Sequence, residues 1–343
     1  MIIEPHEVSI LIVTYNNQIS IEYCLDSLVK LKRQHNIEII LVDNASADGT
    51  VMVVERYSGV DIIKNKENIG YCAANNQAIK RASDQFILLL NPDIVLTEDF
   101  LANALEVMGS HPNVALLTGK VLSMDNKAQP TLYEGRPIID TVGMKMCRNR
   151  QTVIIGEGEI DNGQYDEEQH VFAVCGAVCL SRRSALEEAM IDGQVFDEKF
   201  FAYKEDLDLA WRLRKLGWSC YYTPNAVAYH ARHWKRGLSN RSKIDSLRRY
   251  YSFKNRRLMI LKNDTIREIL PDIIHIFIFE LLSLFYAIIF EQFLLRAYLD
   301  IIKEFPRIQK WRREIFKKQK AGRSLPPGLN SLDNQDQLQK RLE

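Results

Sequence analysis

The chain has 343 residues, of which 46% are hydrophobic and 26% are charged, and its formal net charge is +1. This composition is typical of a globular protein with one large core or two domains, and it excludes a disordered or fibrous chain. A net charge near zero gives no general attraction to nucleic acid, so we expect no nucleic-acid partner. The first residues show no basic segment followed by a long apolar run, so we expect no secretory signal.

The first hundred residues alternate between apolar runs and helical patterns. Continuous apolar runs near residues 8–16, 37–46, 60–68 and 84–96 predict strands that are buried on both faces. Helical patterns lie between them, near residues 19–32, 48–58 and 70–82. This alternation predicts an α/β fold with a Rossmann-like, mostly parallel sheet flanked by helices. Ligands of such sheets bind at the carboxyl ends of the strands, where "TYNN", "DNASADGT", "NKENIG" and "NPD" lie.

The rest of the chain changes character twice. Residues 120–170 are polar and turn-rich, which indicates long loops or hairpins. A strand and a helix follow within residues 170–186, then an acidic helix near 204–217 and a strand near 218–230. From about Arg241 the pattern is helical, and we expect the polar residues 321–343 to form a flexible tail.

The six cysteines form no CxxC pair, and no histidine near Cys175 and Cys179 completes a zinc site. We expect reduced thiols in or near the core of a cytoplasmic protein, with disulfides as the alternative.

The segment "LLLNPD" places Asn91 and Asp93 directly after a buried strand, at the expected ligand edge. An amide oxygen and a carboxylate around a rigid proline suit a hard divalent cation, which would neutralise a diphosphate. A simple turn is the other interpretation. Asp43 and Asn44 end another strand, and Gly70 opens a helix, where backbone amides bind an anion or are merely capped.

The acidic helix begins with two neighbouring carboxylates, Glu205 and Asp206, although like charges repel. The helix dipole favours acidic residues in the first turn and explains one of them. A carboxylate at the ligand edge is also suited to act as a general base. His230 ends the following strand; a lone histidine is more often structural than a metal ligand.

These motifs, in this order, resemble the family 2 glycosyltransferases, which are inverting nucleotide-sugar enzymes with the GT-A fold. The resemblance is greatest to a rhamnosyltransferase-like bacterial subgroup. It runs over roughly residues 8–260, through "VSILIVTYNN", "VDNASADGT", "NIGYCAANNQAI", "LLLNPD", "VCGAVCLSRR", "FDEKFFAYKEDLDLAWRLRKLGW" and "VAYH".

The resemblance implies a role for each matching position. Asp206 matches the catalytic base and Glu205 its neighbour, while Asp93 and His230 match ligands of Mg²⁺ or Mn²⁺. Asn91 stands where the family's DxD motif has its first aspartate, and an amide is the weaker ligand. The resemblance assigns the nucleotide to Thr14, Tyr15, Asn16, Asp43, Asn44, Asn68, Gly70, Asn75 and Asn91, and the sugar or acceptor to Cys175, Gly176, Ala177 and Trp211.

The C-terminal third indicates the kind of acceptor. Ile273–Phe290 is nearly long enough to span a bilayer, but it contains His275 and Glu280, which are costly at the midplane. The basic segment "RIQKWRREIFKKQK" has the composition of a helix that lies on anionic lipid. Three interpretations remain open: a membrane-surface contact, a buried hairpin or homo-oligomer interface, and a true span.

We therefore expect a GT-A nucleotide-sugar-binding and catalytic domain at 1–240 and an amphipathic helical region at 241–320. The expected activity moves a sugar from a nucleoside-diphosphate sugar, with dTDP-rhamnose as the first candidate, to a glycan or lipid-linked acceptor in bacterial surface polysaccharide synthesis. The enzyme would lie at the inner face of the cell membrane. A UDP-hexose-dependent transferase and a non-catalytic nucleotide-sugar-binding protein are the alternatives. A nucleotidyltransferase would need a glycine-rich basic loop after the first strand, and "TYNNQISIEY" is not one.

Overall fold

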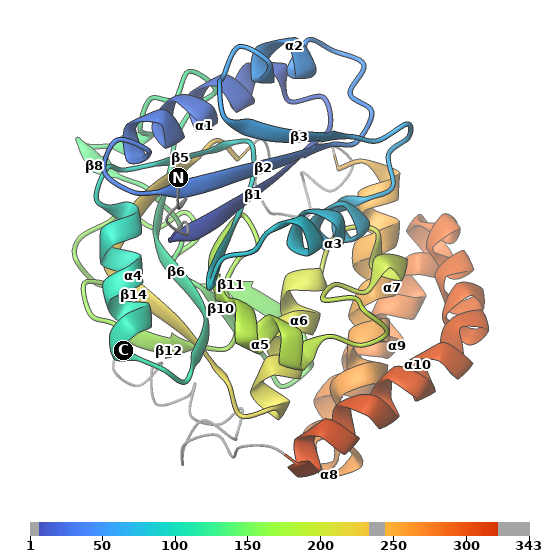
Figure 1. Ribbon diagram of the computed structural model, residues 1–343. Helices are drawn as coiled ribbons and strands as arrows, with labels where there is room; N and C mark the ends of the chain where they lie inside the picture. The colour runs from blue at the N-terminus through green and yellow to red at the C-terminus, as the bar shows by residue number, and fades with distance from the viewer. Residues whose placement is uncertain (1–6, 233–243, 322–343) are drawn as a thin grey trace.

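A single large sheet organises the protein (Figure 1). The computed structural model describes residues 7–232 and 244–321, and ten strands of this part of the chain form the sheet. Their order is β12-β14-β6-β13-β4-β1-β2-β3, with β5 paired to β14 and β9 paired to β6. The strands are β1 (Val8–Thr14), β2 (Ile37–Asp43), β3 (Val60–Lys64), β4 (Phe86–Leu90), β5 (Ile94–Leu96), β6 (Val114–Ser123), β9 (Ile139–Thr141), β12 (Gln169–Val171), β13 (Val178–Arg182) and β14 (Ser219–His230).

The predicted parallel strands are confirmed. β1 pairs in parallel with β2 and β4, and β2 pairs in parallel with β3. All seven residues of β1 are buried, as expected of a strand covered by helices on both faces. Parallel pairing places Thr14 directly opposite Asp43, so the polar ends of β1 and β2 meet at one edge of the sheet. β13 then pairs antiparallel between β4 and β6.

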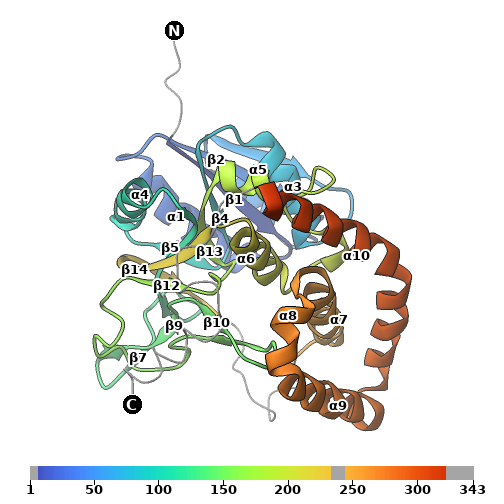
Figure 2. The same cartoon turned by 90° about the horizontal axis from the view of Figure 1, so that it is seen from below.

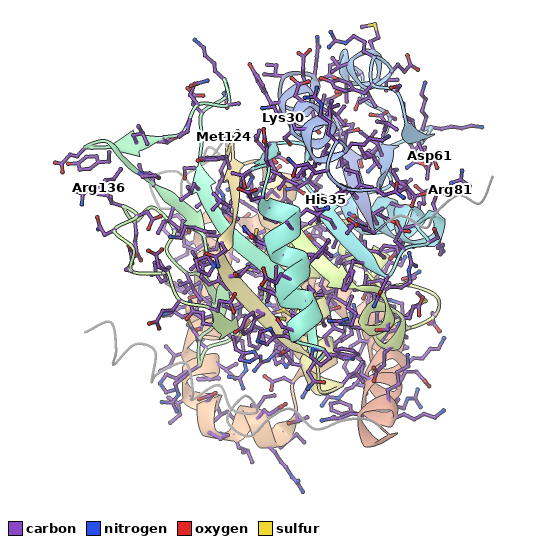
Figure 3. The ribbon with its side chains drawn as sticks, turned by 60° about the vertical axis from the view of Figure 1, so that its left-hand side comes forward. Lys30, His35, Asp61, Arg81, Met124 and Arg136 are labelled. Atoms are coloured by element: carbon purple, nitrogen blue, oxygen red, sulfur yellow. The ribbon has the colours of Figure 1, made fainter. Side chains whose placement is uncertain are left out.

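Helices flank this sheet, as the sequence predicts. They are α1 (Gln18–Leu31), α2 (Thr50–Val54), α3 (Tyr71–Arg81), α4 (Phe100–Ser110), α5 (Arg183–Ala189) and α6 (Glu205–Lys215). At the β3 edge, Arg81 of α3 donates a hydrogen bond of 2.6 Å to Asp61 of β3, and both side chains are exposed (Figure 3).

Two of these helices differ from the sequence prediction. α2 is shorter than predicted because Arg56 and Tyr57 donate to the carbonyls three residues back, which closes the helix as a tighter turn. α4 was not predicted, although Phe100, Ala104 and Met108 form a buried stripe at helical spacing.

The turn-rich segment between β6 and β13 consists of short hairpins, as predicted. Outside the main sheet it contains β7 (Leu132–Tyr133), β8 (Arg136–Pro137), β10 (Met144–Met146) and β11 (Thr152–Ile154). Within it, β9 pairs with the end of β6, which brings Asp140 into the interior.

The C-terminal helices gather at one side of the sheet, next to α6 (Figure 2). They are α7 (Ser246–Asn263), α8 (Ile266–Ile269), α9 (Ile273–Phe290) and α10 (Arg296–Ala321), with short 3-10 turns η3 (Leu270–Asp272) and η4 (Gln292–Leu295) between them. A further 3-10 turn, η1 (Glu198–Phe200), precedes α6. The predicted helical region is thus confirmed. The division at residue 240 stays a prediction, and the predicted flexible tail lies outside the described residues apart from its first residue.

A buried charge network joins these helices to the rest. The Lys262 ammonium on α7 lies 3.0 Å from Asp197 and 2.8 Å from Asp208 of α6, and all three side chains are buried. Burial would raise the pKa of Asp197, but the charges of Lys262 and Arg307 outweigh it and lower that pKa to about 2. α6 and α7 are therefore joined by a buried ion pair between Asp208 and Lys262.

All six cysteines are free thiols, as predicted. Four of them are buried and two, Cys147 and Cys175, are partly exposed.

Candidate functional site

The ends of β1 and β2 form one corner of the site. Thr14 donates a hydrogen bond of 3.1 Å to the Asp43 carboxylate, which also accepts from the hydroxyl and the amide of Ser46. These bonds fix the carboxylate in a buried position at the strand end. Tyr15 is 50% exposed beside it, so its ring is available to a flat ligand such as a nucleobase.

Asn16 connects the two loops of this corner. Its backbone has a φ of 58°, its amide donates to Ser46, and its side-chain oxygen accepts from the Ala47 amide at 2.8 Å. The left-handed conformation is one that asparagine tolerates better than most residues. Asn16 therefore shapes the loops through its side chain.

Gly70 forms the next part of the edge, at the start of α3. The Asn68 side chain accepts from the Gly70 amide at 3.0 Å, and the Asn44 side chain donates to the Gly70 carbonyl at 3.3 Å. Gly70 has a φ of 88°, and a Cβ there would lie 2.5 Å from the Phe201 ring. The structure thus brings Asn44, Asn68 and Gly70 together, whereas Asn75 is buried and donates to the Tyr71 carbonyl.

His230 and Asp93 lie face to face at the end of β14. The His230 Nε2 atom is 3.4 Å from Asp93, and its Nδ1 atom is 2.8 Å from the buried carboxylate of Asp140. Burial lowers the pKa of His230, but the hydrogen bonds and charges of Asp140 and Asp93 outweigh it and raise that pKa to about 9. Arg232 binds the other side of Asp140 at 2.8 Å and so holds that carboxylate in place.

This pair has the chemistry of a divalent cation site. A carboxylate on Nδ1 fixes the histidine tautomer and leaves Nε2 to bind a metal, which is the usual arrangement of metal-ligating histidines. In the described part of the chain, no cluster of three or more His, Cys, Asp or Glu side chains is arranged to hold a metal. Mg²⁺ is commonly held by only one or two protein carboxylates together with substrate phosphates, so Asp93 and His230 fit a metal that arrives with a diphosphate.

The segment Cys175–Ala177 joins this corner to the acidic helix. The Ala177 carbonyl accepts from the Asn91 amide at 2.8 Å, and the Gly176 amide donates to the Asp206 carboxylate at 3.2 Å. One short segment, which turns at Gly176 and Ala177, therefore contacts both the "NPD" corner and Asp206. The Cys175 thiol lies in the same segment, and burial raises its pKa to about 12, so it stays protonated.

Glu205 and Asp206 lie beside a recess with mainly apolar walls, which include Leu89, Leu116 and Val174. Asp206 accepts from the amides of Gly176 and Leu207, whereas the buried Oε2 of Glu205 has no hydrogen-bond partner among the described residues. Burial and the charge of Asp206 raise the pKa of Glu205 to about 8, and burial also raises the pKa of Asp206. Both Asp206 oxygens accept from amides and the Glu205 Oε2 does not, so the hydrogen bonds favour the negative charge on Asp206 and the proton on Glu205.

A strained turn aims this pair at the site. Phe201, Tyr203 and Lys204 all have φ between 63° and 73°, a region that costs free energy for residues other than glycine. The buried side-chain nitrogen of Asn255 on α7 lies 2.8 to 2.9 Å from the carbonyl oxygens of Phe200, Ala202 and Tyr203, and its two N–H groups are shared among them. Asn255 therefore stabilises the backbone of this turn from α7.

Comparison with known families identifies the chain. A family model described as glycosyl transferase family 2 matches residues 9–189, which is more than half of the sequence. The chain belongs to glycosyl transferase family 2. The resemblance stated from the motifs is confirmed, and the protein is a glycosyltransferase.

The names of two bacterial relatives describe a rhamnosyltransferase and a polysaccharide synthase. It is 29% identical over 237 residues to N-acetylglucosaminyl-diphospho-decaprenol L-rhamnosyltransferase of Mycobacterium tuberculosis, over 64% of this chain and 74% of the relative. It is 23% identical over 229 residues to poly-beta-1,6-N-acetyl-D-glucosamine synthase of Staphylococcus aureus, over 66% and 50%.

Solved structures confirm the GT-A fold of this glycosyltransferase. GalNAc-T7, solved with UDP, GalNAc and Mn²⁺, superposes with a TM-score of 0.58 at 13% identity, over 76% of this chain and 48% of that one. Residues 1–349 of S. aureus TarS superpose with a TM-score of 0.53 at 15% identity, over 96% and 88%. At these identities the likeness shows the fold alone.

Some residues of this glycosyltransferase lie where the sequence did not place them. Trp211 does not join the acidic pair: it lies about 140° round α6 from Asp206, and its ring packs edge-on against Phe172 in the core. Asp140 and Asn255 were not predicted. Asp140 follows an ordinary apolar pair in the turn-rich region, and Asn255 is a polar residue on an amphipathic helix, so neither carries a signal in a single sequence.

Proposed function

We propose that this glycosyltransferase transfers a sugar from a nucleoside-diphosphate sugar with inversion at the anomeric carbon, using Asp206 as the general base. The observation that carries the proposal is the Cys175–Ala177 segment, which contacts Asn91 on one side and Asp206 on the other. This contact supports a single cleft in which the diphosphate corner and the base face the same bound sugar.

The reaction then needs one proton transfer and one displacement. Asp206 accepts the proton of an acceptor hydroxyl while that oxygen forms a bond to the anomeric carbon. The bond from this carbon to the diphosphate breaks on the opposite face, and the nucleoside diphosphate takes the electron pair. General-base assistance is worth about 10²- to 10⁴-fold in rate.

Glu205 supports this role by staying neutral. Two adjacent carboxylates in a recess with apolar walls cannot both ionise at low cost, and the proton rests on Glu205 because amide donors stabilise the charge on Asp206. The negative charge is thereby concentrated on Asp206, the residue that must accept the acceptor's proton.

Asp93 and His230 would hold Mg²⁺ or Mn²⁺, with Asn91 beside them near the nucleotide. The cation, when bound, neutralises charge on the leaving diphosphate. The donor set described above supports this assignment, as does the Mn²⁺ with which GalNAc-T7 was solved.

The nucleotide would lie along the strand ends formed by Thr14, Tyr15, Asn16, Asp43 and Asn44, continuing to Asn68, Gly70 and Asn75. The first candidate donor is dTDP-rhamnose, supported by the mycobacterial rhamnosyltransferase. UDP-hexoses are the alternative, supported by the TarS structure with UDP-GlcNAc. Cys175, Gly176 and Ala177 would face the sugar or the acceptor.

The acceptor would be a glycan or a lipid-linked glycan of bacterial cell-wall or surface polysaccharide synthesis. The mycobacterial relative, by its name, acts on a diphospho-decaprenol-linked sugar. A lipid-linked acceptor would place the enzyme at the inner face of the cell membrane.

Donor hydrolysis tests this proposal. Purified protein should release nucleoside diphosphate slowly from one member of a panel that includes dTDP-rhamnose, UDP-GlcNAc and UDP-glucose, and chelation of divalent metal should stop it. Asp206→Asn should lose at least 100-fold in turnover of the acceptor reaction and keep donor affinity in calorimetry. Asp93→Ala should weaken donor binding only when metal is present. Full turnover in Asp206→Asn would remove Asp206 from its role.

A further inference from the structure

The helix α9 turns an apolar face away from the protein. Ten of its large apolar side chains, among them Ile274, Phe277, Phe285 and Phe290, are 48–69% exposed. The exposed face continues onto α8 with Ile266 and onto the first half of α10 with exposed apolar residues that include Ile302. Monomeric proteins rarely expose contiguous apolar patches beyond roughly 300–600 Å², so such a surface marks a contact. We call the exposed apolar side of α8, α9 and the first half of α10 the α9 face.

The inner side of α9 is polar and tied to α7. Glu280 forms ion pairs with Arg256 and Arg257, and Arg257 also donates to Ser283 at 3.1 Å. Residues Ile266–Phe290 are long and apolar enough to cross a membrane by length and composition. Their most apolar stretch of 18 residues has a mean hydropathy of 2.4, and only 6% of that stretch is buried. Crossing a bilayer would pull Glu280 away from both arginines and place its carboxylate in hydrocarbon, which is strongly unfavourable. The ion pairs therefore favour a helix that stays on the protein.

The exposed charges that border the α9 face are mainly positive. The carboxylates of Asp272 and Glu291 are buried and paired, with Arg150 and Arg249 respectively. The exposed cations Arg267, Arg296 and Lys303 lie at its two ends, on α8 and α10. Two carboxylates also lie there, Glu268 and Asp300, and each forms an ion pair with a lysine, Lys215 and Lys303 respectively. An exposed apolar surface bordered by cations is complementary to an anionic lipid surface.

The same charges disfavour a second copy of the chain. In a two-fold symmetric dimer a surface meets itself, so each border cation would face an equivalent set of cations. A lipid surface instead provides phosphate groups for the cations and acyl chains for the apolar residues.

We propose that the α9 face rests on an anionic lipid bilayer, with α9 lying along the membrane surface and remaining docked on α7. One part of the proposal rests on the proposed function: that membrane binding brings the site to a lipid-linked acceptor. The binding itself follows from the exposed side chains.

Vesicle sedimentation with the full chain tests the proposal. Vesicles of phosphatidylcholine with phosphatidylglycerol should bind the protein about 100-fold more tightly than phosphatidylcholine alone, since each basic residue near an anionic surface adds about 1 kcal/mol. The double variant Phe277→Gln/Phe285→Gln should lose at least tenfold in binding. The matched control Leu132→Gln/Tyr133→Gln changes two exposed apolar side chains of the β7 hairpin and should bind as the wild type does. Arg267→Gln/Arg296→Gln should lose most of the preference for anionic lipid.

Three results overturn the proposal. Unchanged binding of the Phe277/Phe285 variant means that another surface meets the lipid. A wild-type dimer that this variant splits, together with no vesicle binding, assigns the α9 face to a second copy. Bound protein that never exchanges to an excess of empty vesicles indicates a spanning helix.

Donor hydrolysis separates this proposal from the proposed function. Hydrolysis uses a water-soluble donor, so the Phe277/Phe285 variant should hydrolyse it at the wild-type rate, which also shows that the variant is folded. Vesicle binding without any donor hydrolysis supports the α9 face and counts against the proposed function alone. Donor hydrolysis without vesicle binding supports the proposed function and counts against lipid binding by the α9 face.

Discussion

The side-chain amide of Asn255 lies 2.8 Å from the carbonyl oxygen of Tyr203, two residues before Glu205. Three left-handed backbone conformations precede the acidic pair, at Phe201, Tyr203 and Lys204. Such conformations persist only where surrounding contacts hold them. The contact with Asn255 therefore makes the orientation of the two carboxylates depend on α7.

We predict that Asn255→Ala lowers kcat about 10- to 100-fold. Without Asn255 the strained turn relaxes and the carboxylates shift, which should raise the activation free energy by about 1–3 kcal/mol. The Kd for the donor should stay within about threefold, since the nucleotide end of the cleft is formed by other elements. Steady-state kinetics and calorimetry measure the two quantities.

Asn103→Ala is the matched control, because Asn103 also donates to a backbone carbonyl, that of Asn225, but on α4. It should leave kcat unchanged. Equal kcat in both variants, with equal loss of Tm, would show that Asn255 acts on stability alone.

The raised pKa of Glu205 predicts an unusual pH dependence of stability. Between its ordinary value of 4.5 and the folded value of about 8, the folded protein keeps a proton that the unfolded chain releases. The free energy of unfolding should therefore fall as pH rises through this window, by at most about 1.4 kcal/mol per pH unit, and level off above it.

Glu205→Gln carries no titrating proton, so its denaturant-unfolding midpoint should fall less steeply from pH 5 to pH 8 than that of the wild type. Parallel curves for the two proteins would show that Glu205 titrates normally and that Asp206 holds the shared proton.

The close approach of Gly70 to Phe201 predicts a specific sensitivity. Gly70→Ala adds a Cβ 2.5 Å from the Phe201 ring at a φ of 88°, so Phe201 and the turn behind it must move. We expect a loss of about 2–4 kcal/mol in unfolding free energy, the sum of left-handed strain and overpacking. Turnover should fall as well, because the displaced turn carries Glu205.

Gly158→Ala separates the two causes. Gly158 has a φ of 80°, and no atom of the described residues lies within 4 Å of an added Cβ, so only the strain applies, about 1–2 kcal/mol. Identical losses in both variants would remove the steric contact with Phe201 from the explanation.

The buried charges between α6 and α7 predict a large loss on removal of one partner. Lys262→Met leaves Asp197 and Asp208 facing each other without their shared cation, which should cost about 3–5 kcal/mol in denaturant unfolding. The exposed pair of Arg81 and Asp61 is the comparison, and Arg81→Met should cost about 0–1 kcal/mol. Similar costs would mean that the surrounding arginines compensate for Lys262.

The sequence predicts best what is local or periodic. β1, β2 and β4 are continuous apolar runs, and their parallel pairing follows from the helices between them, so the meeting of Thr14 and Asp43 could be expected. The place of Asp206 depended on family motifs, and the structure connects it to the "NPD" corner through Gly176 and Ala177.

Contacts between distant segments could not be predicted. Asp140 meets His230 across 90 residues, and Asn255 meets Tyr203 across 52, through folding that no local pattern encodes. Trp211 is a residue that the motif assigned to the sugar or acceptor but that the structure places elsewhere. It lies within a matching motif, but the helical period turns its ring into the core, where it packs on Phe172.

The buried ion pairs of Lys262 with Asp197 and Asp208 also limit how this enzyme could be recombined with its relatives. An exchange of donor specificity that grafted the first 240 residues onto another C-terminal half would leave these two aspartates in the interior without their lysine. Chimeras should therefore be joined beyond Asn263, so that α6 and α7 come from the same parent and Asp208 keeps its ion pair with Lys262.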